Sequence, residues 1–306
     1  GRLVGISIPH NVVSIGNNAF WYSGLSDVYI PATTTSIGAN AFGGSPIETI
    51  TVAATNPHYD SRDNCNAIIE TENNRLVVGC KNTVIPRDVK IIGVQAFSGC
   101  NGIDSLKIPQ GVVTLEESSL GNSSLRYVEI PRSVTEIRSN VFESCGSLLS
   151  IVLKMKKPIR VNSPYYVFNY GNLYSQATLY VPKGTTDAYM EVDGWNDFEN
   201  IVEMDGAQLA KPSMSYDGHY VTATTTDQDV DLYYGFGDED PSNYYDGPFT
   251  VSDLGTVTMI AERSFAQDSE ADTLVIKYFY NGDTLKVAET GLVAEAIEWC
   301  GNDATT

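Results

Sequence analysis

The side chains that could carry chemistry are few and widely spaced. Three histidines, His10, His58 and His219, lack the spacing to cysteine or carboxylate that a zinc site requires. The sequence contains no G-x-S-x-G elbow, no Walker loop and no G-x-G-x-x-G after a predicted strand. Glu116 and Glu117 are adjacent, so on a strand they point to opposite faces and make a poor acid–base pair. We therefore predict that the chain is not an enzyme and holds neither a cofactor nor a metal.

The densest group of carboxylates suggests a calcium site, because hard cations take several oxygen ligands. It consists of Asp227, Asp229, Asp231, Asp238, Glu239 and Asp240. The spacing does not fit an EF-hand loop, which needs glycine at its sixth place and glutamate at its twelfth. We favour the plainer interpretation, a solvated loop whose charges repel one another.

A repeated phrase organises the first two-thirds of the chain. Residues 125–142 read LRYVEIPRSVTEIRSNVF, and related phrases occupy residues 3–20, 25–42, 83–97 and 103–120. Successive copies in uninterrupted stretches are 22 or 23 residues apart. A fixed period of this length is typical of a solenoid, in which one coil cannot bury its apolar side alone.

The first strand of each copy fits the leucine-rich-repeat phrase L-x-x-L-x-L, as in Leu25, Val28 and Ile30. Because side chains alternate along a strand, the residues between these inward positions face outward. The candidate exposed sheet surface is Tyr29, Thr51, Lys107, Tyr127 and Glu129. Tyrosine on a repetitive sheet provides large contact area at low entropy cost, as in protein-recognition surfaces. It also suits any half-buried strand, so a purely structural role stays open.

The period breaks between Val52 and Ile85, which are 33 residues apart. Within this insert, residues 53–82, two apolar runs flank the polar ETENNR, which predicts a hairpin that protrudes from or widens one coil. After Lys154 the phrase decays. Residues 154–205 are predicted to cap the stack, with a helix over 186–191 and with Trp195, Phe198 and Ile201 covering the last coil.

Five cysteines leave at least one unpaired. Cys100 and Cys145 occupy the same place in copies that are two coils apart, about 10 Å at ~4.8 Å per coil. Since bridging needs less than about 7 Å, these are predicted to be buried thiols. Cys65 and Cys80 flank the predicted hairpin, and both a disulfide and two free thiols are left open.

The repeat phrase is absent from residues 206–280. Short alternating runs separated by turn clusters predict a small antiparallel sandwich. Residues 281–306 are predicted to be a linker with the start of a helix capped by Thr290. The apolar face of that helix has no partner in the sequence, and no leader precedes Gly1, so we expect a piece of a longer chain.

The composition restricts the partners. Formal net charge is −19, from 38 acidic and 19 basic residues, which disfavours nucleic acid and anionic lipid surfaces. No apolar run approaches the ~18 residues of a membrane span. The hydrophobic content of 42% is enough for a sizeable core.

The I-P, V-x-x-I-G and A-F marks of the repeat resemble the BspA-type leucine-rich repeats of surface proteins from Bacteroides-like bacteria. The insert NPHYDSRDNCNAIIETENNRLVVGCKNTVIP and the closing LYVPKGTTDAYMEVDGWNDFENIVE strengthen the resemblance. It implies an extracellular or surface-anchored adhesin that binds host matrix proteins or other bacteria. Three departures are expected to weaken single coils: Ser119-Leu120 for Ala-Phe, Leu115-Glu116 for Ile-Gly, and Arg138 for glycine.

Residues 211–262 resemble the immunoglobulin-like module at the C-terminus of chitobiases and β-hexosaminidases, through KPSMSYDG, VDLYYGFGDEDP, YYDGPFTV and GTVTMIAE. That resemblance implies a spacer or accessory module. The expected fold is thus mostly β: a leucine-rich-repeat solenoid over 1–205, then an immunoglobulin-like sandwich over 206–280.

Two functions follow from these predictions. The favoured one is a non-catalytic, adhesin-like protein that presents its repeat sheet to a host or bacterial surface protein. The alternative is the carbohydrate-binding or spacer part of a larger glycan-processing protein, with sugar rings stacking on Tyr233, Tyr234, Tyr244 and Tyr245.

Overall fold

The computed structural model describes residues 8–161, 167–168, 172–281 and 284–287. The chain divides into two compact units, residues 1–203 and 204–306, which are described separately below.

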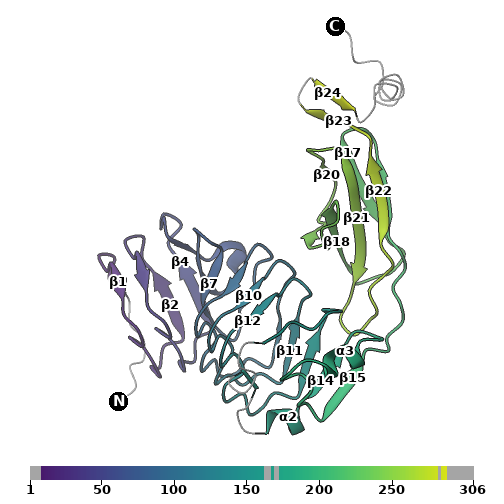
Figure 1. Ribbon diagram of the computed structural model, residues 1–306. Coiled ribbons are helices and arrows are strands. Elements are labelled where there is room, and N and C mark those ends of the chain that lie inside the picture. Colours follow the sequence, from purple (N-terminus) through teal and green to yellow (C-terminus); the bar gives the residue numbers. More distant parts are fainter. Residues whose placement is uncertain (1–7, 162–166, 169–171, 282–283, 288–306) are drawn as a thin grey trace. The chain divides into compact units, whose positions relative to one another are not determined.

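The first unit is a parallel β-solenoid, and its coils stack side by side (Figure 1). One face of each coil carries the Ile-Pro strand. These strands form the pair β2 (Asp27–Ile30) and β4 (Thr49–Val52), and the five-stranded sheet of β9 (Ser105–Lys107), β11 (Tyr127–Ile130), β13 (Ser150–Leu153), β14 (Thr178–Val181) and β15 (Asn200–Glu203). Val28 pairs with Ile50, and Val128 pairs with Leu106 and Ile151. Equivalent residues of successive coils are therefore hydrogen-bonded neighbours.

The second face is made of two-residue strands. β1 (Ser14–Ile15) pairs with β3 (Ser36–Ile37), and β8 (Ile91–Ile92), β10 (Thr114–Leu115) and β12 (Glu136–Ile137) continue the same parallel arrangement. Between the faces, Leu25, Val28 and Ile30 are buried, and the rings of Phe20 and Phe42 stack at 5.2 Å. Burying each such side chain stabilises the fold by about 1.5–3 kcal/mol. The predicted leucine-rich-repeat solenoid is confirmed.

The insert does not protrude from the solenoid. Its strands β5 (Tyr59–Asp60), β6 (Ala67–Glu70) and β7 (Arg75–Gly79) form an antiparallel meander, and Leu76 of β7 pairs in parallel with Ile92. β6 is buried on both sides, because Ala67 and Ile69 face the C-terminal core while Ile68 faces the N-terminal core. The predicted hairpin is confirmed, and of the two forms left open the protruding one is wrong. The two apolar runs, in β6 and β7, are buried on both faces of the sheet, between the N-terminal and C-terminal cores, and not on one face of a protruding hairpin. We call β6 and β7 the partition hairpin.

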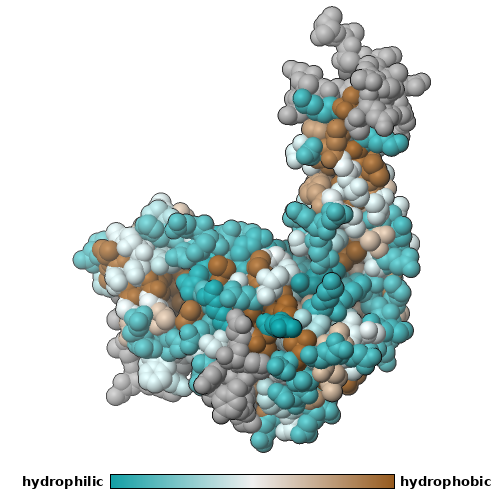
Figure 2. Space-filling view, viewed as in Figure 1, coloured by the Kyte–Doolittle hydropathy of each residue, from teal (hydrophilic) through white to brown (hydrophobic). Residues whose placement is uncertain are grey.

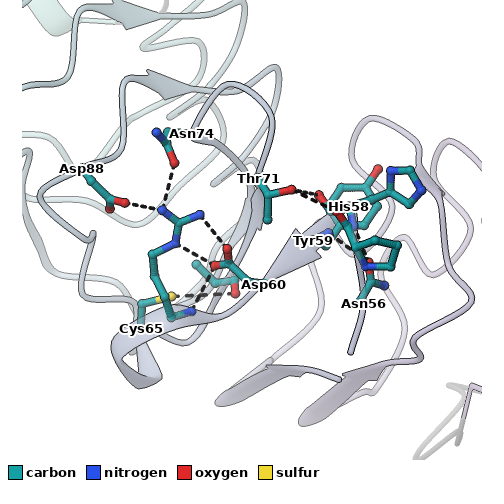
Figure 3. Close-up of polar contacts among 11 residues, drawn as sticks. Asn56, His58, Tyr59, Asp60, Cys65, Thr71, Asn74 and Asp88 are labelled. Carbon is teal, nitrogen blue, oxygen red and sulfur yellow. Dashed lines mark hydrogen bonds and ion pairs between the residues drawn. The ribbon is translucent and has the colours of Figure 1, made fainter. Parts of the chain in front are cut away.

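Polar side chains fasten the insert to the coil before it. Figure 3 shows Asn56, His58 and Tyr59, the residues of the insert from which these contacts start. The Asn56 amide nitrogen donates to the carbonyl oxygens of Pro31 (2.8 Å) and Thr34 (3.0 Å). Its oxygen accepts from the backbone N–H groups of His58 (2.8 Å) and Tyr59 (2.9 Å). The buried Tyr59 hydroxyl accepts from the Ile37 N–H at 3.1 Å. The Tyr59 hydroxyl thus accepts a hydrogen bond from a backbone N–H group that would otherwise pair with a carbonyl oxygen of the next coil.

Arg62, in the 3₁₀ turn η1 (Arg62–Asn64), holds the insert to the coil after it. Its guanidinium donates to both carboxylate oxygens of Asp60 and to the Asn74 side chain (2.8 Å), and it pairs with Asp88. Hydrogen bonding to Asp60 raises the pKa of Arg62, so this charge is fixed. Figure 3 shows Asp60, Asn74 and Asp88 converging on this one group.

Two of the departures from the repeat phrase are partners of each other. The Glu116 carboxylate accepts from Arg138 of the next coil at 3.0 Å and from Arg75 of β7 at 2.8 Å. It also accepts from the Val94 N–H at 3.0 Å. The two coils that carry Glu116 and Arg138 where the repeat phrase has glycine are therefore joined by a half-buried network of ion pairs.

An aromatic cluster packs at the C-terminal end of the unit. α2 (Leu173–Gln176) and α3 (Thr186–Met190), where a helix was predicted over 186–191, flank β14. Tyr189 and Trp195 are fully buried; the Tyr189 hydroxyl donates to the Met155 carbonyl at 2.7 Å, and Trp195 Nε1 donates to that of Ile159 at 2.8 Å. Each large ring thus buries its area and still satisfies its polar atom.

The second unit is antiparallel. One sheet has the order β16 (Ser213–Tyr216), β17 (Tyr220–Thr224), β20 (Phe249–Thr250); the other has the order β19 (Asn243–Tyr244), β18 (Asp231–Phe236), β21 (Gly255–Glu262), β22 (Asp272–Ile276). A hairpin of β23 (Tyr278–Asn281) and β24 (Thr284–Val287) follows, where a linker was predicted. The helix predicted after Thr290, with Cys300, lies outside the described residues.

One corner of the coil requires a left-handed backbone. In equivalent turns, Tyr22, Gly44, Gly99, Asn122 and Ser144 all have φ between +50° and +70°. The insert supplies no turn at this corner, so the turns of Gly44 and Gly99 meet directly. A Cβ added to Gly99 would lie 2.6 Å from the Gly44 backbone nitrogen. Glycine is needed there for both φ and space.

We expect Gly99→Ala to lower the free energy of unfolding by at least about 1–2 kcal/mol, from left-handed strain plus the backbone clash. Gly146→Ala is the matched control, because its Cβ would meet no atom within 4 Å. That variant should change stability by less than about 1 kcal/mol. Urea unfolding followed by circular dichroism measures both, and equal midpoints would contradict this account of the corner.

Candidate functional site

The predicted candidates for chemistry do not converge. Within the described ranges, no group of three or more His, Cys, Asp or Glu side chains is arranged to hold a metal ion. In the acidic segment, Asp227 instead accepts from the Ala210 N–H at 2.5 Å. Among those same residues, no helix has the length and apolar character to cross a membrane.

The described cysteines, Cys65, Cys80, Cys100 and Cys145, are buried free thiols. This confirms the prediction for Cys100 and Cys145, and it gives Cys65 and Cys80 as the unbridged alternative. Burial raises the pKa of Cys65 to about 11 and that of Cys100 to about 12, and it also raises the pKa of Cys80 and Cys145. Since the thiolate is the nucleophile, these groups are poorly reactive at neutral pH.

The predicted sheet surface is present at the N-terminal coils. Tyr29 pairs in register with Thr51, and both face outward while their neighbours Val28, Ile30 and Ile50 are buried. The Tyr29 side chain is 54% exposed. Lys107 of β9 is also exposed.

Two predicted surface residues differ from the expectation. Glu129 is only 3% exposed, so its place on the exposed surface was wrong. Its outward neighbour on β13, Val152, is also buried, which means that the outer side of the sheet is covered here. The Glu129 carboxylate accepts from the Tyr127 hydroxyl at 2.7 Å and lies 3.8 Å from the Lys107 ammonium. These two partners offset the free-energy cost of burying the Glu129 carboxylate. Tyr127 itself is half-buried.

Sequence reasoning missed Val84, which is 74% exposed. It precedes Ile85 as Tyr29 precedes Ile30 and Lys107 precedes Ile108, so its place in the repeat was a usable signal. The exposed outward positions of the repeat are therefore Tyr29, Thr51, Val84 and Lys107, and we call this set the exposed column. Val84 lies in no strand, and β9 belongs to a different sheet from β2 and β4.

The side chains of this column suit contact with a partner. It offers an aromatic ring, a hydroxyl, a branched apolar side chain and one ammonium group, and none of these forms a proton-transfer pair. On the face shown in Figure 2, hydrophobic residues of the solenoid appear as separate patches among hydrophilic ones. Such a mixed surface suits a non-obligate protein interface, in which a few aromatic anchors carry most of the binding energy.

The tyrosines proposed for sugar stacking are engaged within the second unit. Tyr233 is 4% exposed, and its ring contacts Tyr244 edge-on at 5.7 Å. The Tyr234 ring stacks on Phe249 at 3.9 Å, and the Tyr245 hydroxyl accepts from the Ala223 N–H at 3.0 Å. Tyr233 and Tyr234 lie on β18, which has a neighbouring strand on each side, β19 and β21.

The sequence matches the family described as "BspA type Leucine rich repeat region", in six copies over residues 2–67 and 77–182. No curated protein matches the chain. Among solved structures, it is similar to a leucine rich cell surface protein from Faecalibacterium prausnitzii A2-165, with 26% identity and a TM-score of 0.47 over 64% of this chain and 52% of that one. A leucine-rich repeat protein from Eubacterium ventriosum has 20% identity and a TM-score of 0.51, over 68% of this chain and 57% of that one.

The second of these structures supports the solenoid fold. The chain spans little more than half the length of either structure.

We expect iodoacetamide at pH 8 to leave the peptides of Cys65, Cys80, Cys100 and Cys145 unlabelled in the native protein. The raised pKa values keep the thiolate fraction low at that pH, and the thiolate would form only as the pH rises toward the pKa of each group. The same peptides should label fully in guanidinium without reductant, as mass spectrometry can measure. A Cys65–Cys80 cross-linked peptide would contradict the free thiols.

Proposed function

The chain belongs to the BspA-type leucine-rich repeat family, and from that membership we propose that it is a non-catalytic, adhesin-like interaction protein. It acts outside the cell or at the bacterial surface and binds a host or bacterial surface protein. The partner contacts the outward face of the Ile-Pro strands.

The observation that carries this proposal is the setting of Tyr29. Its strand is hydrogen-bonded in register to β4, and its neighbours Val28 and Ile30 are locked in the core. The ring therefore projects from a rigid backbone and loses little conformational entropy on binding. Thr51 and Lys107 add a hydroxyl and a charge along the same face, which favours specificity over bulk hydrophobic attraction.

We propose that the second unit is a spacer that resembles the immunoglobulin-like module of chitobiases. Its two antiparallel sheets and their two small hydrophobic cores support this role. Of the net charge of −19, residues 204–306 contribute −15, from 19 acidic and 4 basic residues, while residues 1–203 contribute −4, from 19 acidic and 15 basic. A strongly acidic spacer keeps an anionic cell envelope at a distance.

We expect Tyr29→Ala to weaken binding to whichever partner the protein captures from a panel of fibronectin, laminin, collagen and fibrinogen. Removing a preorganised aromatic anchor should raise the Kd at least about tenfold. Surface plasmon resonance measures the Kd, and thermal unfolding should show an unchanged Tm because the ring is largely exposed.

The matched control is Tyr220→Ala, which removes a 48%-exposed tyrosine from the second unit and should leave the Kd unchanged. If Tyr29→Ala and Tyr220→Ala bind equally well, the Ile-Pro face is not the interaction surface.

A further inference from the structure

Two large aromatic side chains stand exposed on one tight turn of the first coil. Trp21 is 56% exposed and Tyr22 is 49% exposed, and their rings meet edge-on with centroids 4.8 Å apart. The turn is closed by the Trp21 N–H, which donates to the Asn18 carbonyl at 3.1 Å. Neither ring is needed to fill the core, which the buried Leu25 and Phe42 occupy at this level.

Tyr22 is held in an unfavourable backbone conformation. Its φ is +50°, and the equivalent turns have Gly44, Gly99, Asn122 and Ser144, all of which have small or short polar side chains. A bulky aromatic residue is disfavoured in the left-handed region. Strain that is kept at an exposed position indicates a functional use of the side chain.

The Tyr22 ring also packs against the next coil. A Cβ on Gly44 would lie 2.7 Å from the ring, which means that the ring rests directly on the glycine backbone of the next coil. The Tyr22 N–H donates to the Gly43 carbonyl at 2.8 Å. The ring is thus fixed on one side, and Tyr22 is still 49% exposed, as a stacking platform requires.

Two exposed asparagines, Asn17 and Asn18, precede the two rings in the same turn. The oxygen of Asn17 accepts from the Ala39 N–H at 2.9 Å, and that of Asn18 accepts from the Asn40 side chain at 2.9 Å. Both residues are exposed. Because the oxygens are used within the solenoid, the orientation of each amide is set, and each NH₂ group remains to donate to a ligand.

Charge is nearly absent from this region. Between residues 8 and 47, Asp27 is the only residue with a formal charge. Among residues 8–47 an anionic glycan would meet no Lys or Arg, and a protein interface would find only Asp27 as a charge to set its register. Flat aromatic faces with neutral amide donors match a sugar ring, whose C–H groups pack on the rings and whose hydroxyls accept from the amides.

We propose that Trp21 and Tyr22 form a binding platform for an uncharged sugar unit of a polysaccharide, with Asn17 and Asn18 donating hydrogen bonds to its hydroxyls. This site is distinct from the Tyr29 column, and it does not depend on that column binding protein.

Native affinity electrophoresis tests the proposal with the whole chain in gels that contain galactomannan, arabinoxylan or mixed-linkage β-glucan, and with heparin as the anionic comparator. At least one neutral polysaccharide should retard the protein. Trp21→Ala should weaken that retardation at least about fivefold. Tyr220→Ala, the control for loss of an exposed ring elsewhere, should leave it unchanged.

Tyr22→Gly separates binding from structure. Glycine relieves the left-handed strain, so the Tm should be no lower than that of the original chain, while retardation should fall at least about fivefold. The proposal is overturned if no neutral polysaccharide retards the protein, if heparin alone does so, or if both variants bind as the original does. It is also overturned if Trp21→Ala loses binding to a matrix protein of the panel and keeps its polysaccharide retardation.

Discussion

The first unit depends on one constraint: no coil of 22 or 23 residues can bury its own apolar side or satisfy its own backbone. Each coil offers a single strand of two to four residues per face, far less than an independently stable sheet requires. The ladder from Val28 to Ile50, and those from Leu106 through Val128 to Ile151, supply both needs at once, because the same neighbour donates the hydrogen bonds and covers the side chains. Stability is therefore a property of adjacent pairs of coils.

That constraint explains the elaborate insert. A gap in a solenoid exposes two open coil ends, and β6 closes both by presenting Ile68 to one core and Ala67 with Ile69 to the other. Backbone donors at the gap cannot go unpaired, so the Asn56 amide and the Tyr59 hydroxyl stand in for the missing strand. The contact of Gly44 with Gly99 completes the closure where the chain has no turn to offer.

The repeat period and the strand alternation were enough to predict the solenoid, its inward residues, and the outward direction of Tyr29, Thr51 and Lys107. Those features follow from local spacing. The burial of Glu129 did not follow from local spacing, because strand alternation gives the direction of a side chain and not whether that side of the sheet is covered. The burial of the partition hairpin on both faces could not be predicted either, because the sequence of a short apolar run does not show whether one or both of its faces are buried. Of the four tyrosines considered for sugar stacking, Tyr233 is buried, whereas Tyr234, Tyr244 and Tyr245 are half-buried. The sequence pattern of the second unit does not distinguish a packed ring from an exposed one.

The same architecture separates folding from recognition. Inward positions such as Val128 and Leu106 must stay apolar and of fixed size, whereas an outward position changes without disturbing the ladder beneath it. Residues that break a local rule at an outward position are therefore informative. Glu116 and Arg138 break the repeat phrase and are explained by their mutual ion pair. Tyr22 breaks the left-handed preference of its corner, and its ring packs on the Gly44 backbone without belonging to the N-terminal core. A position where the fold would be better served by glycine, yet which presents an aromatic ring to solvent, is best understood through what that ring binds.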